Sequence, residues 1–327
     1  EVGVLVANGL GGGSLINAGV ALRPSPDLFD QACWPAAYRP GGAAHGALQD
    51  AMSQVLGKLE AQAMPAAREM PKFAALDRLG KAIGCGPAEA VPLTIAHQPR
   101  TTAQGVAQDP CIRCGNCFTG CNVGAKGTLL TTLIPAAASQ GARFFTGATA
   151  LEIEPLAGPQ SRWRVHFALT ARTKAQPFVR HFHVDTHTLV LSAGTLGSTE
   201  LLLRSPRVTH SPRLGHSFSA NGDAIAMAWG QKERVSGISA PRPTSTGISR
   251  DVGPTIVGTL RAPIRVDGRD RTVLVQDGAV PSAMSMAVIA LGSSLSSLHR
   301  YVDKDAPGFH GADAPDVLAT PERIGEH

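Results

Sequence analysis

A glycine-rich stretch near the start of the chain constrains the fold more than any other feature. Residues 9–19 read Gly-Leu-Gly-Gly-Gly-Ser-Leu-Ile-Asn-Ala-Gly and follow a short apolar run at residues 2–7. That order predicts a buried strand, a glycine turn and a helix, in which the backbone approaches a phosphate group closely and points N–H groups at it. The stretch therefore predicts a nucleotide-binding loop, with a glycine turn that binds nothing as the alternative.

The stretch is one residue short of the dinucleotide motif G-x-G-x-x-G. In that motif an acidic residue about twenty positions further on meets the ribose. Here Pro24 and Pro26 interrupt the region where the second strand should form, so Asp27 and Asp30 have no strand to lie on. A simple NAD-type site is therefore disfavoured.

Composition excludes several classes of protein. The 327 residues can bury a large core and predict two interleaved domains, and 43% apolar with 17% charged residues is typical of a globular protein. The net charge of +5 is mild and its Lys and Arg residues are scattered, so we expect no nucleic-acid partner. No apolar run has the length to cross a bilayer, and we expect no integral membrane segment.

Four of the six cysteines form a C-x2-C-x2-C-x3-C run: Cys111, Cys114, Cys117 and Cys121. This is the ferredoxin spacing, in which thiolates hold a 4Fe-4S cluster, although Asn122 replaces the proline that usually follows. Zinc on four thiolates and a cysteine-rich turn without metal are the alternatives. Because the cysteines do not suggest a secreted disulfide framework, we expect a reducing compartment and a cytoplasmic location.

Hydrophobic periodicity predicts a mixed α/β chain. We expect helices at residues 45–59, 73–83, 128–139, 198–204 and 283–298, strands at 148–153, 163–169, 179–184 and 188–191, and an irregular extended connection at 91–110. The 128–139 helix should kink at Pro135. A second turn of small residues, 192–194, follows the last of these strands.

Three separated motifs resemble the glucose-methanol-choline (GMC) family of flavin oxidoreductases, and in particular its cholesterol-oxidase-like branch. They are Asn-Gly-Leu-Gly-Gly-Gly-Ser-Leu-Ile-Asn at 8–17, Cys-Gly-Asn-Cys…Gly-Cys-Asn-Val-Gly-Ala-Lys at 114–126, and Leu-Ser-Ala-Gly-Thr-Leu-Gly-Ser-Thr-Glu at 191–200. The resemblance extends from Gly3 to about Pro281. It implies a doubly wound FAD-binding domain, present in part, interleaved with a substrate domain built on an antiparallel sheet.

The resemblance also implies roles for individual residues. The expected FAD contacts are Gly9, Gly11, Gly12, Gly13, Ser14, Asn17, Gly19, Ala150, Ser192, Ala193 and Gly194. By the same resemblance, residues 1–44 and 122–205 belong to the FAD-binding domain, 45–121 form a helical and loop insertion with the cysteine run, and 206–327 belong to the substrate domain. The flavin would accept a hydride from the substrate, and the protein would orient it.

Departures from the family pattern suggest a chain that lacks both ends of its flavin domain. The family's first strand with G-x-G-x-x-G and its ribose-binding acid are not found here, nor is the pair near its end, a His with an Asn or a second His, that removes the alcohol proton and steers the flavin. Where the cholesterol-oxidase branch has a glutamate base, Asp277 is the ionisable candidate, and a turn before Gly278 is its alternative role.

The sequence thus predicts an FAD-dependent oxidoreductase that acts on the CH–OH group of a small-molecule alcohol or sterol. The electron acceptor is left open. An iron–sulfur electron-transfer module that uses the cysteine run, and an inactive fragment, are the alternatives.

Overall fold

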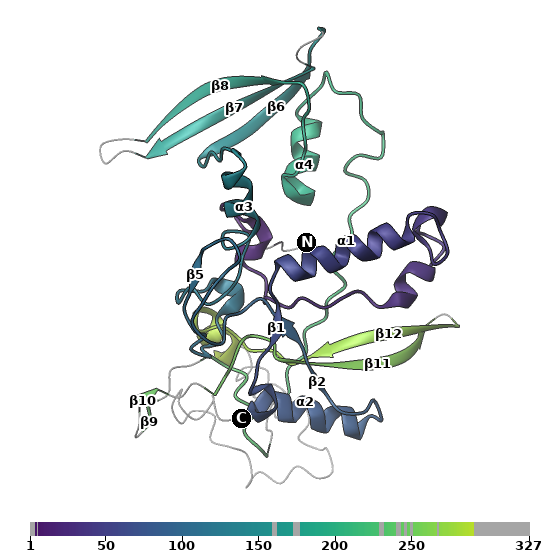
Figure 1. Ribbon diagram of the computed structural model, residues 1–327, viewed down its shortest axis with the longest axis vertical. Helices are drawn as coiled ribbons and strands as arrows, with labels where there is room; N and C mark the ends of the chain where they lie inside the picture. The colour runs from purple at the N-terminus through teal and green to yellow at the C-terminus, as the bar shows by residue number, and fades with distance from the viewer. Residues whose placement is uncertain are drawn as a thin grey trace. The chain divides into compact units, whose positions relative to one another are not determined.

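A computed structural model describes residues 4, 6–158, 162–172, 177–228, 232–239, 243–244, 247–248, 251–266 and 268–290. The chain divides into two compact units. The first comprises Glu1–Ala142 with Ala228–His327, and the second comprises Arg143–Met227 (Figure 1). Each unit is described by itself.

The first unit holds short helices and short strands connected by long turns. Its helical segments are η1 (Gly12–Leu15), η2 (Pro26–Asp30), η3 (Ala36–Tyr38), α1 (His45–Lys58), η4 (Ala67–Glu69), α2 (Pro71–Ala82), η5 (Cys117–Thr119) and α3 (Leu133–Ser139). Residues 282–290 are also helical. Its strands are β1 (Gln62–Ala63), β2 (Glu89–Ala90), β3 (Pro92–Leu93), β4 (Arg100–Thr101), β5 (Ala107–Gln108), β9 (Pro243–Thr244), β10 (Gly247–Ile248), β11 (Gly258–Val266) and β12 (Arg269–Gln276).

Antiparallel pairing joins these strands. The β11–β12 hairpin, which pairs Thr259 with Gln276 and Val266 with Arg269, adds β2 on its other side to make a three-stranded sheet. The remaining pairs are β1 with β3, β4 with β5, and β9 with β10. Within the described residues of this unit, parallel pairing is limited to isolated bridges, such as Cys114 with Gly253.

The core of the first unit lies between α2 and the β11 strand. Phe73 and Leu76 of α2 pack with Val257 and Leu260, and all four are at most 5% exposed. Gly80 permits this approach, because a Cβ there would lie 2.3 Å from the carbonyl oxygen of Gly86 and 2.5 Å from a Leu260 methyl group. The β11–β12 hairpin and α2 therefore pack against each other in the core of the first unit.

The second unit is a three-stranded antiparallel meander with one helix against it (Figure 1). Its elements are β6 (Ala148–Pro155), β7 (Trp163–Arg172), β8 (Pro177–Thr186) and α4 (Gly194–Leu203). A buried hydroxyl links helix to sheet, because Ser205 Oγ accepts the Ile153 N–H at 2.9 Å and donates to the Leu201 carbonyl at 2.6 Å.

The mixed helix and antiparallel-sheet content confirms the predicted α/β class, and the helices at 45 and 71 and the meander lie where periodicity placed them. The apolar stripe of α1, however, contains no buried residue. The predicted helix at 128–139 begins only at Leu133, where Pro135 lies in its first turn and needs no hydrogen bond. The helix predicted at 283–298 is present to residue 290, and its remainder lies outside the described residues.

Two predicted strands differ from the structure. Residues 4, 6 and 7 carry no strand, and neither do residues 188–191, where Val190 is 77% exposed. A strand needs a hydrogen-bonded neighbour, and no described residue supplies one to either segment. Residues 91–110 form the predicted extended connection, with the two-residue strands β3, β4 and β5 along it. Its first part is buried, because Val91, Leu93, Ile95 and Ala96 are at most 1% exposed.

In the part of the chain that the structure describes, no helix combines the length and the apolar character that a membrane crossing requires.

Candidate functional site

The predicted nucleotide loop is a tight turn that runs directly into η1. Gly12 donates its N–H to the Gly9 carbonyl at 3.0 Å, and Gly11 and Gly12 have φ angles of +107° and +53°. Such angles cost an L-residue with a side chain, so glycine is required here for the turn itself. The expected strand-turn-helix motif is therefore reduced to a turn and one 3-10 turn.

One side of the loop is open, and the other is fastened to the protein. A Cβ added to Gly12 or Gly13 would meet no atom within 4 Å. On the fastened side, Ser14 Oγ donates to the Gly11 carbonyl at 2.7 Å and accepts the Leu129 N–H at 3.1 Å. The hydroxyl of Ser14 therefore shapes the loop, and the open glycine backbone is the surface available to a ligand.

Asn17 and Gly19 form the exit from the loop. The side-chain oxygen of Asn17 accepts the Gly19 N–H at 3.1 Å, and its amide nitrogen has no partner among the described residues. Gly19 is buried at φ +77°, and a Cβ there would lie 3.2 Å from Thr94 Oγ1. The turn thus buries Gly19 against the core and leaves Asn17 exposed with a free donor.

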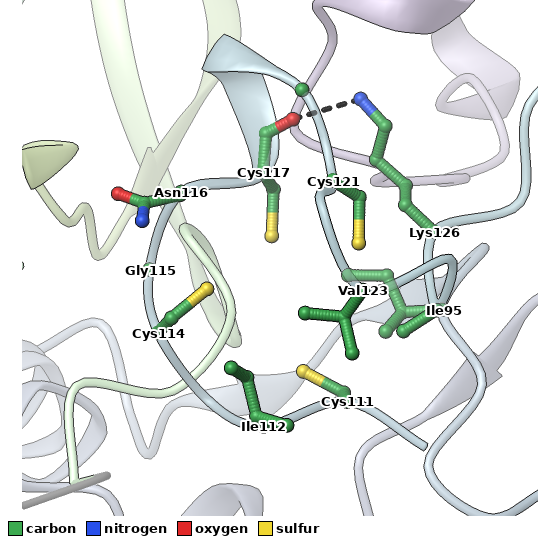
Figure 2. Close-up of a pocket in the computed structure, with 12 residues that line it drawn as sticks. Ile95, Cys111, Ile112, Cys114, Gly115, Asn116, Cys117, Cys121, Val123 and Lys126 are labelled. Carbon is green, nitrogen blue, oxygen red and sulfur yellow. Dashed lines mark hydrogen bonds between the residues drawn. The ribbon is translucent and has the colours of Figure 1, made fainter. Parts of the chain in front are cut away.

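The four cysteines of the run line one pocket beside this loop, and their sulfur atoms point into it (Figure 2). All four are free thiols. Among the residues described, however, no group of three or more Cys, His, Asp or Glu side chains is placed to hold a metal ion. The predicted 4Fe-4S or zinc site at Cys111, Cys114, Cys117 and Cys121 is therefore unsupported.

Packing accounts for three of these thiols. Cys117 belongs to the hydrophobic core, and Cys111 and Cys121 pack against that core as partly buried side chains. Free cysteine commonly behaves as a small apolar residue in such positions. Burial raises the pKa of the Cys111 thiol to about 11, so the neutral thiol is its stable form at neutral pH.

Lys126 connects the cysteine run to the glycine loop. Its Nζ donates to the carbonyls of Leu15 and Asn17, both at 2.9 Å, and to that of Cys117 at 2.8 Å (Figure 2). Lys126 is only 4% exposed, and burial lowers the pKa of its ammonium. Because all three hydrogens of the ammonium are donated to backbone carbonyls, Lys126 is not a solvated surface lysine.

Asp277 is buried within the first unit. Its Oδ1 accepts the N–H groups of Val257 at 2.9 Å and Gly258 at 2.6 Å, and its Oδ2 lies 2.9 Å from Lys72 Nζ. Lys72 also donates to the carbonyls of Pro254 and Thr255. These contacts are those of a structural ion pair, so the role of Asp277 as a base stays a prediction that they do not favour.

The other predicted cofactor residues belong to the second unit. Ala150 is an exposed residue of β6 that pairs with Phe167. Ser192, Ala193 and Gly194 are exposed and lead into α4, where Gly194 has φ +76° and the Ala193 N–H donates to Ser198 Oγ at 3.0 Å. The turn of small residues is therefore present, and its role at a cofactor stays a prediction.

Lys72 and Thr255 are site-supporting residues that the motifs did not indicate. Thr255 Oγ1 accepts the Cys117 N–H at 3.2 Å and donates to the Gly115 carbonyl at 3.0 Å. The only available sequence signal was their surroundings: Lys72 follows Pro71 at the start of an apolar helical face, and Thr255 lies in a Gly-Pro-Thr-Ile segment.

A family model for GMC oxidoreductases matches residues 2–221, and the chain therefore belongs to that family. The match confirms the predicted family, and the named relatives described next support its cholesterol-oxidase-like branch.

Individual relatives are more distant. The chain is 24% identical over 246 residues to a cholesterol oxidase of Acinetobacter baumannii, covering 69% of this chain and 42% of that protein. It is 28% identical over 252 residues to a cholesterol oxidase of Mycobacterium tuberculosis, covering 70% of this chain and 41% of that protein. The chain thus spans about two fifths of the length of these relatives.

Proposed function

We propose that this chain forms part of an FAD-dependent oxidoreductase that oxidises the CH–OH group of an alcohol or sterol. Membership of the GMC family supports the flavin, and similarity to two proteins named cholesterol oxidases supports a sterol among the candidate substrates. The observation that carries the proposal is the glycine loop, which is rigidly held on one side and open at Gly12 and Gly13 on the other.

The residues present fit FAD. The open backbone of Gly12 and Gly13 lets a phosphate approach, and Gly9 and Gly11 shape the turn that presents it. The free amide of Asn17 is a hydrogen-bond donor beside it. We assign the same cofactor to Ser14 and Gly19 through the shape of the loop, and to Ala150, Ser192, Ala193 and Gly194 through the family resemblance. Bound FAD would accept the hydride, while a base takes the hydroxyl proton.

The first test is the absorbance spectrum of the purified protein, as isolated and after addition of FAD. The proposal requires structured flavin bands in the visible blue. A broad brown absorbance bleached by dithionite would instead indicate an iron–sulfur cluster, and a protein that takes up no flavin would overturn the proposal.

A matched pair of variants tests whether the loop is the binding site. Gly13→Asp adds a carboxylate on the open side, where a Cβ meets no atom within 4 Å, and should weaken FAD binding at least about tenfold by charge repulsion. Gly46→Asp is the control, because Gly46 also has open space and lies in the first turn of α1. Equal FAD affinity of the two variants would place the cofactor elsewhere.

The substrate class is tested without assuming an electron acceptor. A sterol or a simple alcohol is added anaerobically to the flavin-loaded protein, and loss of the oxidised flavin absorbance reports hydride transfer in a single turnover. Bleaching by a sterol but not by short alcohols would assign the sterol, and the reverse result would assign the alcohol.

A further inference from the structure

The carbonyl groups of Leu15 and Asn17 lie where the short helix η1 ends. An α-helix or 3-10 helix leaves its last carbonyls without backbone partners, and a lysine side chain is one of the groups that can satisfy them. Here Lys126 Nζ donates a hydrogen bond to each of these carbonyls at 2.9 Å. The third hydrogen of this ammonium goes to the Cys117 carbonyl at 2.8 Å. One buried cation therefore uses all three donors to join two loops that are far apart in sequence.

The backbone of Lys126 is itself fixed. Lys126 pairs with Ile95 in an antiparallel bridge, and the carbonyl of its neighbour Ala125 accepts the N–H of Ala96 at 2.9 Å and the side-chain amide of Gln108 at 3.1 Å. Ile95 and Ala96 lie in the core at 1% exposure or less. The ammonium is thus presented to the glycine loop from a backbone that is hydrogen-bonded to the buried core.

The charge of Lys126 is not neutralised by a carboxylate. No Asp or Glu among the described residues lies within ion-pair distance of it, whereas the other buried lysine, Lys72, pairs with Asp277. Three carbonyl dipoles satisfy its hydrogen bonds but carry no net charge. Because a buried charge is screened less than one in bulk water, the electrostatic field of Lys126 reaches the neighbouring surface. That surface is the exposed side of the turn at Asn17.

We propose that Lys126 is the positioning residue of the cofactor loop. It holds the turn from Leu15 to Asn17 so that the Asn17 amide and the glycine backbone face an anionic cofactor, and it provides that side of the loop with one positive charge. The proposal rests on the proposed function, because FAD is the anion that the loop would bind. A positive charge near a flavin favours the reduced form, which gains negative charge, over the oxidised form.

The test compares three variants in the purified protein. Lys126→Met removes the charge and the three donors at similar length, and Lys126→Gln keeps an amide donor without the charge. Gln108→Leu is the control, because Gln108 is also buried and supports the same backbone but carries no charge. The measurements are the dissociation constant for FAD, the midpoint potential of the bound flavin and the urea midpoint of each protein.

We expect Lys126→Met to weaken FAD binding at least about tenfold, and both Lys126 variants to weaken the binding of reduced FAD about tenfold more than that of oxidised FAD. For a two-electron couple this second effect lowers the potential by about 30 mV. Gln108→Leu should lower the urea midpoint but leave both cofactor measurements unchanged. If Lys126→Met does not fold, Lys126→Gln carries the potential measurement.

Two failures are distinguishable. A wild-type protein that binds no FAD overturns the proposed function. A wild-type protein that binds FAD, with Lys126 variants whose affinity and potential match those of wild type or change as in Gln108→Leu, overturns the role of Lys126 and leaves the proposed function standing.

Discussion

Lys72 and Asp277 form an ion pair in the interior of the first unit, with Nζ 2.9 Å from Oδ2 and side chains that are 1% and 3% exposed. The pair joins α2, which carries Lys72, to Asp277 in the segment after β12. Asp277 also accepts two backbone N–H groups at the start of β11, so it connects three elements. Burial lowers the pKa of the Lys72 ammonium, and the carboxylate beside it opposes that shift. The two charges therefore depend on each other for their stability.

Removing one member of this pair should destabilise the protein strongly. We expect Lys72→Met to lower the free energy of unfolding by about 3–5 kcal/mol, because the carboxylate of Asp277 would stay buried without its cation. Urea unfolding measures the change. Lys81→Met is the control, since Lys81 makes an ion pair of similar length with Asp77 but its side chain is 67% exposed. Loss of this exposed pair should cost less than about 1 kcal/mol. Equal losses would contradict the buried pair.

The same pair separates two roles for Asp277. If Asp277 is a structural residue, Asp277→Asn should lower the urea midpoint. The flavin bound to the folded variant should still be reduced by substrate at close to the wild-type rate. As a base, Asp277→Asn should lose flavin reduction by orders of magnitude with little change in stability. Stopped-flow measurement of anaerobic flavin reduction, beside urea unfolding, distinguishes the outcomes, and the contacts favour the first.

Local patterns were predicted well, and non-local relationships were not. The α2 helix and the β7–β8 hairpin follow from periodicity, because adjacent turns and alternating side chains are encoded within a few residues. The segment at 188–191 has the composition of a strand, but forming one depends on a neighbour that composition does not specify. In the site, the glycine loop was found from its residues, whereas the sequence around Lys126 and Lys72 did not show that these lysines are buried and which carbonyls they reach.

The cysteine run shows the same limit. Its four thiols line one pocket, since short intervals keep side chains on one loop. Spacing does not specify whether those thiols bind a metal or fill a core, because that depends on residues such as Ile95 that pack on them from elsewhere.

Cys111 should make the protein less stable at alkaline pH. Its folded pKa of about 11 lies above the ordinary value of 9.0, so its contribution is complete below pH 9 and is lost as the pH rises through 11. The loss amounts to about 2–3 kcal/mol. Urea unfolding between pH 8 and 11 should show this slope in wild type, and Cys111→Ala should lack that part of it. Parallel slopes in the two proteins would contradict the raised pKa.

Alkylation offers a second measurement of the same thiol. At pH 8 a maleimide should react with the exposed Cys33 well before Cys111, as followed by mass spectrometry of the intact protein and its peptides. Equal rates at the two cysteines would show that Cys111 is neither buried nor held as a neutral thiol.

Acid should affect the second unit through Glu154. Hydrogen bonding to His166, together with nearby Arg207, lowers the pKa of Glu154 below its ordinary 4.5. The resulting stability is present above pH 4.5 and is lost as the pH falls through the lowered pKa. Glu154→Gln should therefore flatten the acid limb of the stability profile, measured by circular dichroism. Glu200→Gln, at an exposed ion pair on α4, is the control and should leave that limb unchanged.

Gly115 and Gly124 differ in their surroundings although their backbones are alike. Their φ angles are +74° and +76°, so alanine at either position should cost about 1–2 kcal/mol of backbone strain. At Gly124 a Cβ meets no atom within 4 Å, whereas at Gly115 it would lie 2.2 Å from Ser239 Oγ and 2.7 Å from a Val252 methyl group. The cysteine loop packs against those residues.

Gly115→Ala should therefore cost about 1–3 kcal/mol more than Gly124→Ala, because the overpacked segment must move in addition to the backbone strain. Urea unfolding of the two variants measures the difference directly, since the shared strain cancels. The carbonyl of Gly115 also accepts the Thr255 hydroxyl at 3.0 Å, so the displacement should weaken the attachment of the cysteine loop to the Thr255 segment. Faster hydrogen exchange at the Cys117 N–H, which Thr255 Oγ1 accepts, would report this loosening, and equal stabilities with unchanged exchange would show that the loop is not packed as described.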